Sequence, residues 1–463
     1  MFYWSTVAVI ALLIAFWAFV LSSTIYVLGT RPIGAVLFVL KTLFLGLITV
    51  PLAILLVVLT LSSMALSGVS RWKAKAELAP RDAIDVEGDV VVHLIHGTFE
   101  HNAAWTLPGS AMCRRIVEKN PMVKISRFVW SGSNTHRGRS DAVRALSKRL
   151  EDSPSVDHYI VAHSHGGNIA RDLWKEYPGL REKIKGLCFL STPFIHRQKI
   201  ERTGKDFTFT HIFGFIVLSQ APLLAVLAAL GMGSYFLLAL IPSSVIALAV
   251  EVCVGKRTEE SLAAELDADH DGVEMGNVTI LHAIGDEADS ILRFVSFLHE
   301  VCFGLFSQLN ATAEKMRAEA ERSEFRRYAP YIIGALMTTL VAIFLWAVDA
   351  KDIWTLAFLI ASASLLLGCF KERKWPSSGD SNILIMAATP VGALSYWLCA
   401  IKSLAYGDWR LMFSPRIFVF SSETPQGSFP VIKYAPRTDG GLVHSTHSHP
   451  DAIEEVACWL GRI

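Results

Sequence analysis

The run "AHSHGG" (162–167) places Ser164 between two histidines at the end of an apolar stretch. The preceding "HYIVAH" (158–163) has the composition of a buried strand, and the residues that follow have helical spacing. Small residues two positions before and after a serine are typical of a nucleophile elbow, because this strand-to-helix turn is too sharp for larger side chains. Ala162 replaces the glycine that is usual at the first position. We predict that Ser164 is a nucleophile; a serine that only caps the helix is the alternative.

A serine nucleophile needs hydrogen-bond donors for the oxyanion of its tetrahedral intermediate, and the segment "HLIHGTFEHNAAW" (93–105) can supply them. Gly97 lets the backbone approach the substrate closely. The N–H groups of Thr98 and His165 are the predicted oxyanion hole. We expect His96 to orient this loop rather than to transfer protons.

The acid of a catalytic triad is expected after a later strand, and "TILHAIGDEADSIL" (279–292) ends a strand in an acidic turn. Asp286 and Asp289 both qualify, and Glu287 is a third candidate. A short carboxylate at a strand end suits the task of fixing the histidine tautomer. Solvated loop acids are the alternative interpretation.

The base is expected last in the chain, and His444 stands between the last predicted strand and a terminal helix. His447 and His449 are rivals. Their H-x-x-H-x-H spacing could indicate a metal, but no acidic or cysteine partner stands at ligand spacing. We therefore predict neither a metal nor a cofactor.

The segment "WSGSNTH" (130–136) is expected at the edge of the site. There Asn134 and His136 could make polar contacts with the substrate. A purely structural loop is the equal alternative.

The elements that must position these residues alternate between strands and helices. Short apolar or β-branched runs predict six strands, and two segments with polar starts have helical spacing. The strands are expected at 89–96, 123–130, 158–163, 184–190, 277–284 and 429–435, and the helices at 140–152 and 451–463. This alternation predicts an α/β fold with a mostly parallel, doubly wound sheet that helices cover on both faces.

Six motifs in order resemble those of bacterial serine esterases of the α/β-hydrolase superfamily, close to its lipase-like branch. They are "HGTFEHNAAWTLPGSAMC", "RFVWSGSNTH", "VAHSHGGN", "STPFI", "GDEAD" and "VHSTHSHPDAIEEV". The resemblance implies an α/β-hydrolase fold in which Ser164 is the nucleophile, His444 the base and Asp286 the acid. It identifies no substrate.

Composition favours a membrane protein over a soluble one. The chain has 463 residues, of which 52% are hydrophobic and only 18% charged. Apolar blocks at 6–28, 42–66, 212–254 and 329–404 approach or exceed the ~20 residues that a bilayer span requires. Because 43 basic residues nearly cancel 42 acidic ones, no global field would attract nucleic acid. The seven cysteines form no CxxC pair, so we predict neither disulfides nor zinc.

These blocks divide the chain into six segments, and the predicted enzyme is assembled from the three polar ones. The segments are an N-terminal transmembrane hairpin (1–70), the first hydrolase part with the oxyanion loop and the elbow (71–205), an apolar hairpin that is a lid or a membrane anchor (206–256), a hydrolase continuation with the acidic turn (257–328), a transmembrane or apolar helical block (329–404) and a C-terminal part with the catalytic histidine (405–463).

A triad shared by three polar segments requires that all three lie on one side of a membrane. Basic residues gather beside those segments, so the positive-inside rule predicts a multi-pass protein of the bacterial inner membrane with its catalytic part on the cytoplasmic side. The predicted function is a membrane-bound serine hydrolase that cleaves carboxylic esters of lipids or other apolar acyl compounds through an acyl-enzyme. The expected partners are that substrate and the bilayer.

Two alternatives to this function stay open. A thioesterase or a peptidase would use the same triad. A non-catalytic membrane scaffold would retain only the fold, since fold does not imply function.

Overall fold

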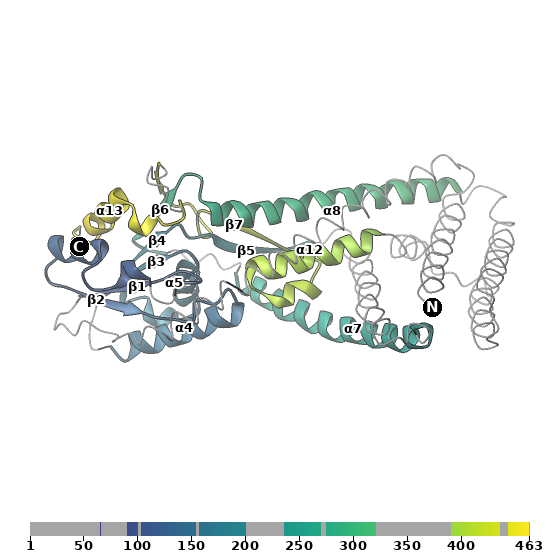
Figure 1. Cartoon of the computed structure of the whole chain (residues 1–463), viewed down its shortest axis with the longest axis horizontal. Coiled ribbons are helices and arrows are strands. Elements are labelled where there is room, and N and C mark those ends of the chain that lie inside the picture. The colour runs from purple at the N-terminus through teal and green to yellow at the C-terminus, as the bar shows by residue number, and fades with distance from the viewer. Residues whose placement is uncertain are drawn as a thin grey trace.

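Six parallel strands form the main sheet of the protein, in the order β2-β1-β3-β4-β6-β8 (Figure 1). The computed structural model describes residues 65, 90–100, 103–153, 157–200, 236–269, 275–320, 390–435 and 443–462. The strands are β1 (Val90–Ile95), β2 (Val123–Phe128), β3 (Asp157–His163), β4 (Ile184–Leu190), β6 (Val278–Ala283) and β8 (Val431–Tyr434). Each overlaps one of the six predicted runs. The prediction of an α/β fold with a mostly parallel sheet is therefore confirmed.

Helices cover both faces of this sheet. They are α3 (Ala111–Lys119), α4 (His136–Glu151), α5 (His165–Glu176) and α13 (Pro450–Leu460). One core joins α4 and α5 to one face, through Leu146, Leu150, Ile169 and Leu173 among others. A second core joins α3 and α13 to the other face, through Met112, Ile116, Val456 and Trp459 among others.

The central strand β3 shows why its apolar run is nearly continuous. Ile160 and Ala162 point into the α4–α5 core, whereas Tyr159 and Val161 point into the α3–α13 core. Successive side chains of a strand alternate between its faces, so a strand covered on both sides needs apolar residues at every position.

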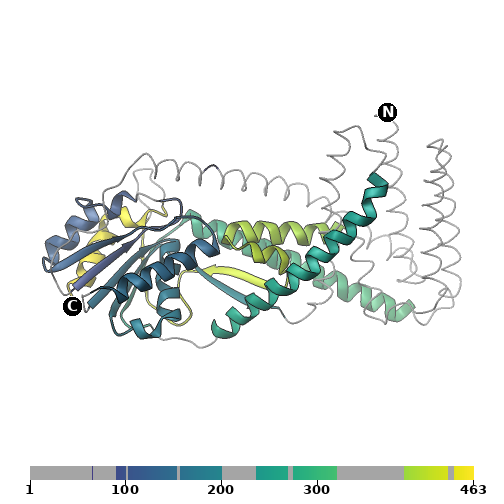
Figure 2. The same cartoon turned by 90° about the horizontal axis from the view of Figure 1, so that it is seen from below.

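A second layer of elements lies beyond one end of the sheet (Figure 1). Its strands β5 (Phe194–Lys199) and β7 (Ile417–Ser422) form an antiparallel pair. Its helices are α7 (Phe236–Asp269), α8 (Glu287–Ala320) and α12 (Pro390–Tyr406). Short 3₁₀ helices occur at η1 (Ala104–Thr106), η2 (Pro178–Leu180), η4 (Trp409–Phe413) and η5 (Thr446–Ser448). Figure 2 shows that α7 and α8 extend from the sheet end past α12.

This layer is held by one buried face on each helix. On α8, the buried residues Leu292, Val295, Ser296 and His299 recur at helical spacing, and this face packs on β7 and α12. On α12, the buried Lys402 donates from its Nζ to the carbonyl of residue 417, 2.7 Å away. A buried lysine satisfied by a strand carbonyl shows that α12 packs within the protein.

The predicted multi-pass membrane localisation is wrong. Over the described residues, no helix combines the length and the apolar composition that a bilayer span requires. In the described parts of the blocks at 212–254 and 329–404, α7 continues into a charged half and α12 buries its second half against α8 and η4. The predicted inner-membrane location with a cytoplasmic catalytic part is contradicted with it. Residues 6–28, 212–235 and 329–389, and nearly all of 42–66, lie outside the described residues.

The packing of α13 on the sheet depends on a glycine in β4. A Cβ added at Gly186 would lie 2.6 Å from Cζ2 of Trp459 and 3.0 Å from the Tyr159 ring. We expect Gly186→Ala to lower the free energy of unfolding by about 1–3 kcal/mol, because overpacking a well-packed core forces neighbours to shift. Urea denaturation measures the change. Gly179→Ala is the matched control, since a Cβ there would meet open space; equal losses in the two variants would contradict the prediction.

Candidate active site

Ser164 lies in the turn between β3 and α5 in a backbone conformation that L-residues rarely adopt, with φ +54° and ψ −133°. Its N–H donates to the carbonyl of Leu190 (2.9 Å), and its own carbonyl accepts from the N–H of Gly167 (2.9 Å). The side chain is buried. Such strain persists only where the surroundings enforce it, and it is concentrated at functional sites.

Glycines around Ser164 allow three backbone segments to meet there. A Cβ on Gly166 would lie 2.7 Å from the carbonyl oxygen of His96, and one on Gly167 would lie 2.0 Å from Oγ1 of Thr192. A Cβ on Gly97 would lie 2.8 Å from the Cβ of Ser164. The crowding explains the small residues that the sequence motif contains. It also places the predicted oxyanion loop directly against the predicted nucleophile.

A histidine orients the predicted oxyanion loop. His96 donates from Nδ1 to the carbonyl of Gly97 (2.8 Å), and its Nε2 accepts from the N–H of Trp130 (3.2 Å). Thr98 follows in the turn, and Phe99 beyond it has φ +61° and donates its N–H to a carbonyl at residue 132 (2.8 Å). These contacts orient the loop. His165, the second predicted oxyanion donor, is the first residue of α5.

Asp286 and His444 meet at the same edge of the sheet. Nδ1 of His444 lies 2.9 and 2.8 Å from the two carboxylate oxygens of Asp286. The carboxylate also accepts the N–H groups of Ala288 (2.9 Å) and Asp289 (3.2 Å). Burial alone would raise the pKa of Asp286, but the hydrogen bond and charge of His444 and the backbone donor outweigh burial and lower it. This arrangement can fix the tautomer of His444 and stabilise its imidazolium form.

The other two candidate acids have different contacts. The carboxylate of Glu287 accepts the backbone N–H groups of residues 443 and 444, each at 3.0 Å. It therefore holds the loop of His444 rather than its ring. Asp289 accepts from the hydroxyl of Ser421 (2.9 Å) and pairs with Arg293 (2.6 Å). The contact with Ser421 joins α8 to β7, and the ion pair with Arg293 lies within α8.

His444 lies beside the elbow. Its ring centroid is 4.8 Å from that of His163, the residue before Ser164, and Nε2 of His163 donates to the carbonyl of His444 (2.9 Å). Of the rival histidines, His447 also packs on His163, with ring centroids 4.4 Å apart. His447 stacks on Trp105, and the ring of His449 accepts the N–H of residue 451 at the start of α13.

A second polar group near Ser164 escaped the sequence analysis. Oε2 of Glu100, in the oxyanion loop, lies 3.3 Å from Nδ1 of His163. Burial lowers the pKa of His163, but the charge of Glu100 and the carbonyl of His444 outweigh burial and raise it above its ordinary value. Glu100 in turn has a lowered pKa, since its pairing with His163 outweighs its own burial. The only sequence signal for this pair was the location of Glu100 within the oxyanion loop.

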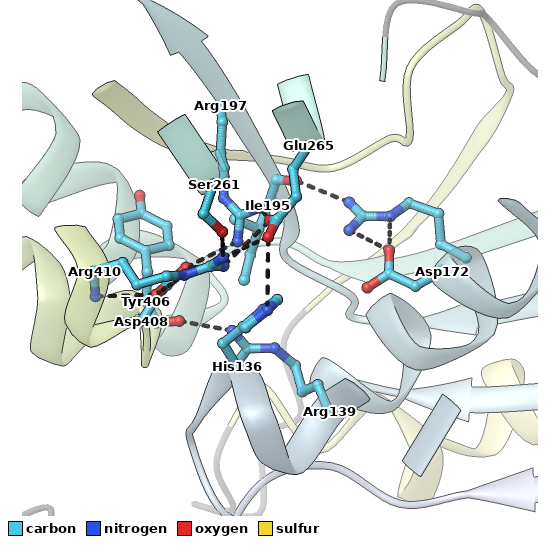
Figure 3. Close-up of polar contacts among 11 residues, drawn as sticks. His136, Arg139, Asp172, Ile195, Arg197, Ser261, Glu265, Tyr406, Asp408 and Arg410 are labelled. Carbon is cyan, nitrogen blue, oxygen red and sulfur yellow. Dashed lines mark hydrogen bonds and ion pairs between the residues drawn. The ribbon is translucent and has the colours of Figure 1, made fainter. Parts of the chain in front are cut away.

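Asn134 and His136, the predicted substrate contacts, join α4 to the second layer. The Asn134 side chain donates to the carbonyls of residues 404 and 405 (3.3 and 3.1 Å), and the N–H of His136 donates to the carbonyl of Gly407 (2.6 Å). Nε2 of His136 also lies 4.0 Å from Glu265 (Figure 3). These are contacts of a structural loop, the alternative that the sequence left open. A role in substrate binding stays a prediction.

Figure 3 shows the charged network that these residues border. Asp408, with 1% of its side chain exposed, accepts from Arg197 (3.2 Å) and Arg410 (2.9 Å). Glu265 accepts from the same two arginines, at 2.6 Å from Arg197. Burial would raise the pKa of Asp408, but these arginines outweigh it and lower the pKa. The network thereby ties β5, α7 and η4 together next to the start of α4.

Comparison of the chain with models of protein families, with curated proteins and with solved structures found no match. The resemblance to serine esterases therefore stays a prediction from the sequence motifs.

The Glu100–His163 pair predicts a pH dependence of stability. A histidine with a raised pKa in the folded state stabilises the fold fully below its unfolded pKa of about 6.5, and this contribution is lost as pH rises through the folded pKa. We expect the urea midpoint of the wild type, in buffer with EDTA, to fall between about pH 6 and pH 9 by more than that of Glu100→Gln, which removes the charge that raises the pKa. Parallel profiles would show that the pair contributes nothing.

Proposed function

We propose that the chain is a serine hydrolase of the α/β-hydrolase type that cleaves carboxylic esters. Ser164 follows β3, Asp286 follows β6 and His444 follows β8. This is the chain order of nucleophile, acid and base that is typical of that fold. Parallel strands present their carboxyl ends at one edge of a sheet, which supports the joint action of the three residues.

The observation that carries the proposal is the contact of His444 with both oxygens of Asp286, beside a serine in a strained turn. The two residues are 158 positions apart in the chain. A histidine that is oriented by a buried carboxylate and packed against the residue before Ser164 is suited to act as its general base.

The proposed reaction proceeds in two halves. Oγ of Ser164 attacks the ester carbonyl while His444 accepts its proton, and the N–H groups of Thr98 and His165 stabilise the oxyanion. The alcohol leaves with the proton from His444, and an acyl-serine remains. Water then repeats the sequence, releasing the carboxylic acid and restoring the serine. Asp286 stays ionised throughout, in keeping with its lowered pKa.

An apolar acyl group is the favoured substrate part. Ile284, two residues before Asp286, has 55% of its surface exposed, and Ile291 and Phe294 are exposed at the start of α8. Exposed apolar side chains next to a polar site are typical of surfaces that bind apolar ligands.

The nucleophile is tested by Ser164→Ala. We expect this variant to lose labelling by a fluorophosphonate probe and to hydrolyse p-nitrophenyl esters at least about 10⁴-fold more slowly, because the other triad members cannot act without the nucleophile. Circular dichroism should be unchanged. Ser131→Ala, in the loop at 130–136, is the control and should label normally. Labelling of Ser164→Ala at the wild-type rate would refute the proposal, and a panel of esters, thioesters and anilides separates esterase from thioesterase and peptidase.

The acid is tested by comparing two aspartates of one turn. Asp286→Asn should lower kcat by about 10³–10⁴-fold, since an amide holds His444 in the wrong tautomer. Asp289→Asn should instead lower the thermal midpoint, because it weakens the contacts with Ser421 and Arg293. Steady-state kinetics and thermal denaturation of both variants measure this split. A larger kcat loss for Asp289→Asn would assign the acid to Asp289.

A further inference from the structure

Glu100, His163 and His447 form a cluster of potential metal ligands beside the candidate triad. One ligand atom of each lies within 4.8 Å of the others. The three residues come from the oxyanion loop, the end of β3 and the 3₁₀ helix η5. They were not predicted as a group because they are far apart in the sequence.

His163 is oriented as a metal ligand requires. Its Nε2–H donates to the carbonyl of His444 (2.9 Å), so in the neutral ring the lone pair is on Nδ1. Only 2% of the residue is exposed. Among the described residues Nδ1 makes no hydrogen bond of good geometry, and Oε2 of Glu100 lies 3.3 Å from it. A histidine that binds a metal typically donates its other ring N–H to a carboxylate or a carbonyl, and His163 has this arrangement.

Aromatic packing holds the second histidine next to the first. The ring centroids of His163 and His447 are 4.4 Å apart, and the two rings are nearly perpendicular. Trp105 stacks on His447 at 5.3 Å and contacts His163 edge-on. The side chain of Glu100 is 32% exposed and forms the side that an ion could enter.

We propose that Glu100, His163 and His447 bind one divalent transition-metal ion, with zinc the best fit. Two imidazoles and one carboxylate are a zinc donor set that leaves a fourth position for water. Zinc–ligand bonds of about 2.0–2.2 Å place tetrahedral ligand atoms about 3.3 Å apart. The cluster must therefore contract. Because Oε2 of Glu100 already lies 3.3 Å from Nδ1 of His163, the movement required is an approach between His447 and these two atoms. We expected no metal because no acidic or cysteine partner stands at ligand spacing from the histidine cluster in the sequence; the fold brings Glu100 to His447.

The ion would clamp three segments of the candidate site. Glu100 is two residues from Thr98, His163 adjoins Ser164, and His447 is three residues from His444. No step of the proposed ester cleavage uses the ion, so this inference goes beyond that function and does not depend on it. Without metal, a proton on His163 paired with Glu100 occupies the same position.

Cobalt binding by the full chain tests the site. The protein, without a histidine tag and freed of metal by EDTA, is titrated with Co²⁺ and followed by visible absorption, and Zn²⁺ is then added to displace it. We expect one Co²⁺ per chain and a raised thermal midpoint. Glu100→Gln and His447→Asn should each weaken binding by at least about tenfold, the scale on which even outer-shell changes act. His449→Asn is the matched control, because asparagine also caps helices, and it should bind as the wild type does.

Three outcomes would overturn the proposal. They are no stoichiometric Co²⁺ binding by the wild type, wild-type Co²⁺ affinity in the double variant Glu100→Gln/His447→Asn, or a loss of Co²⁺ affinity in His449→Asn as large as that in His447→Asn. X-ray absorption of the Co²⁺-loaded wild type gives a second answer that does not depend on the folding of variants. Two imidazole ligands are expected, and a spectrum without any imidazole ligand would refute the site. Fluorophosphonate labelling is scored separately: wild-type protein that binds Co²⁺ without labelling would refute only the hydrolase.

Discussion

The turn at Ser164 is the constraint on which the site depends. A non-glycine residue at φ +54° costs of order 1–3 kcal/mol, and it persists because β3 is held between β1 and β4 while α5 packs on the sheet. The sharpness of the turn brings Gly97 into contact with Ser164 and leaves no space for a side chain at Gly166 or Gly167. The small residues of the motif and the location of the oxyanion loop therefore have one physical cause.

The direction of the parallel strands determines which parts of the chain lie near Ser164. Because the strands are parallel, the loops after β1, β6 and β8 leave the sheet at the edge where β3 ends. Glu100, Asp286 and His444 stand in or directly after these loops. His163 then links two of them, since it pairs with Glu100 through Nδ1 and with the His444 carbonyl through Nε2. His163, which precedes the candidate nucleophile, thus contacts both the predicted oxyanion loop and the loop of the candidate base.

The sequence was informative where burial is local and misleading where it depends on distant partners. The central strands are rich in apolar residues because both of their faces are buried, and the outer strands β2 and β8 still contain β-branched residues, so all six were predictable. Sharp turns need small residues, so the elbow was predictable too. The block at 329–404 was assigned to transmembrane or apolar helices, because hydropathy does not distinguish burial in protein from burial in a bilayer; α12, within this block, packs on α8 and η4. Lys402 on that helix donates a hydrogen bond to a carbonyl of β7, and Glu100 lies near His447 because the folded sheet brings their loops together. No local pattern encodes such pairs.

The charged network connects the second layer to the candidate active site through the backbone. Asp408 and Glu265 neutralise Arg197 and Arg410, and removing one partner would leave a largely buried charge uncompensated (Figure 3). The carbonyl of Gly407, next to Asp408, accepts the N–H of residue 136. In the loop at 130–136, the carbonyl of residue 132 accepts the N–H of Phe99. Thr98 precedes Phe99. Two hydrogen bonds and one short loop therefore connect the network to the predicted oxyanion donor. A shift of the α7–η4 layer would move that donor unless one of the two hydrogen bonds broke.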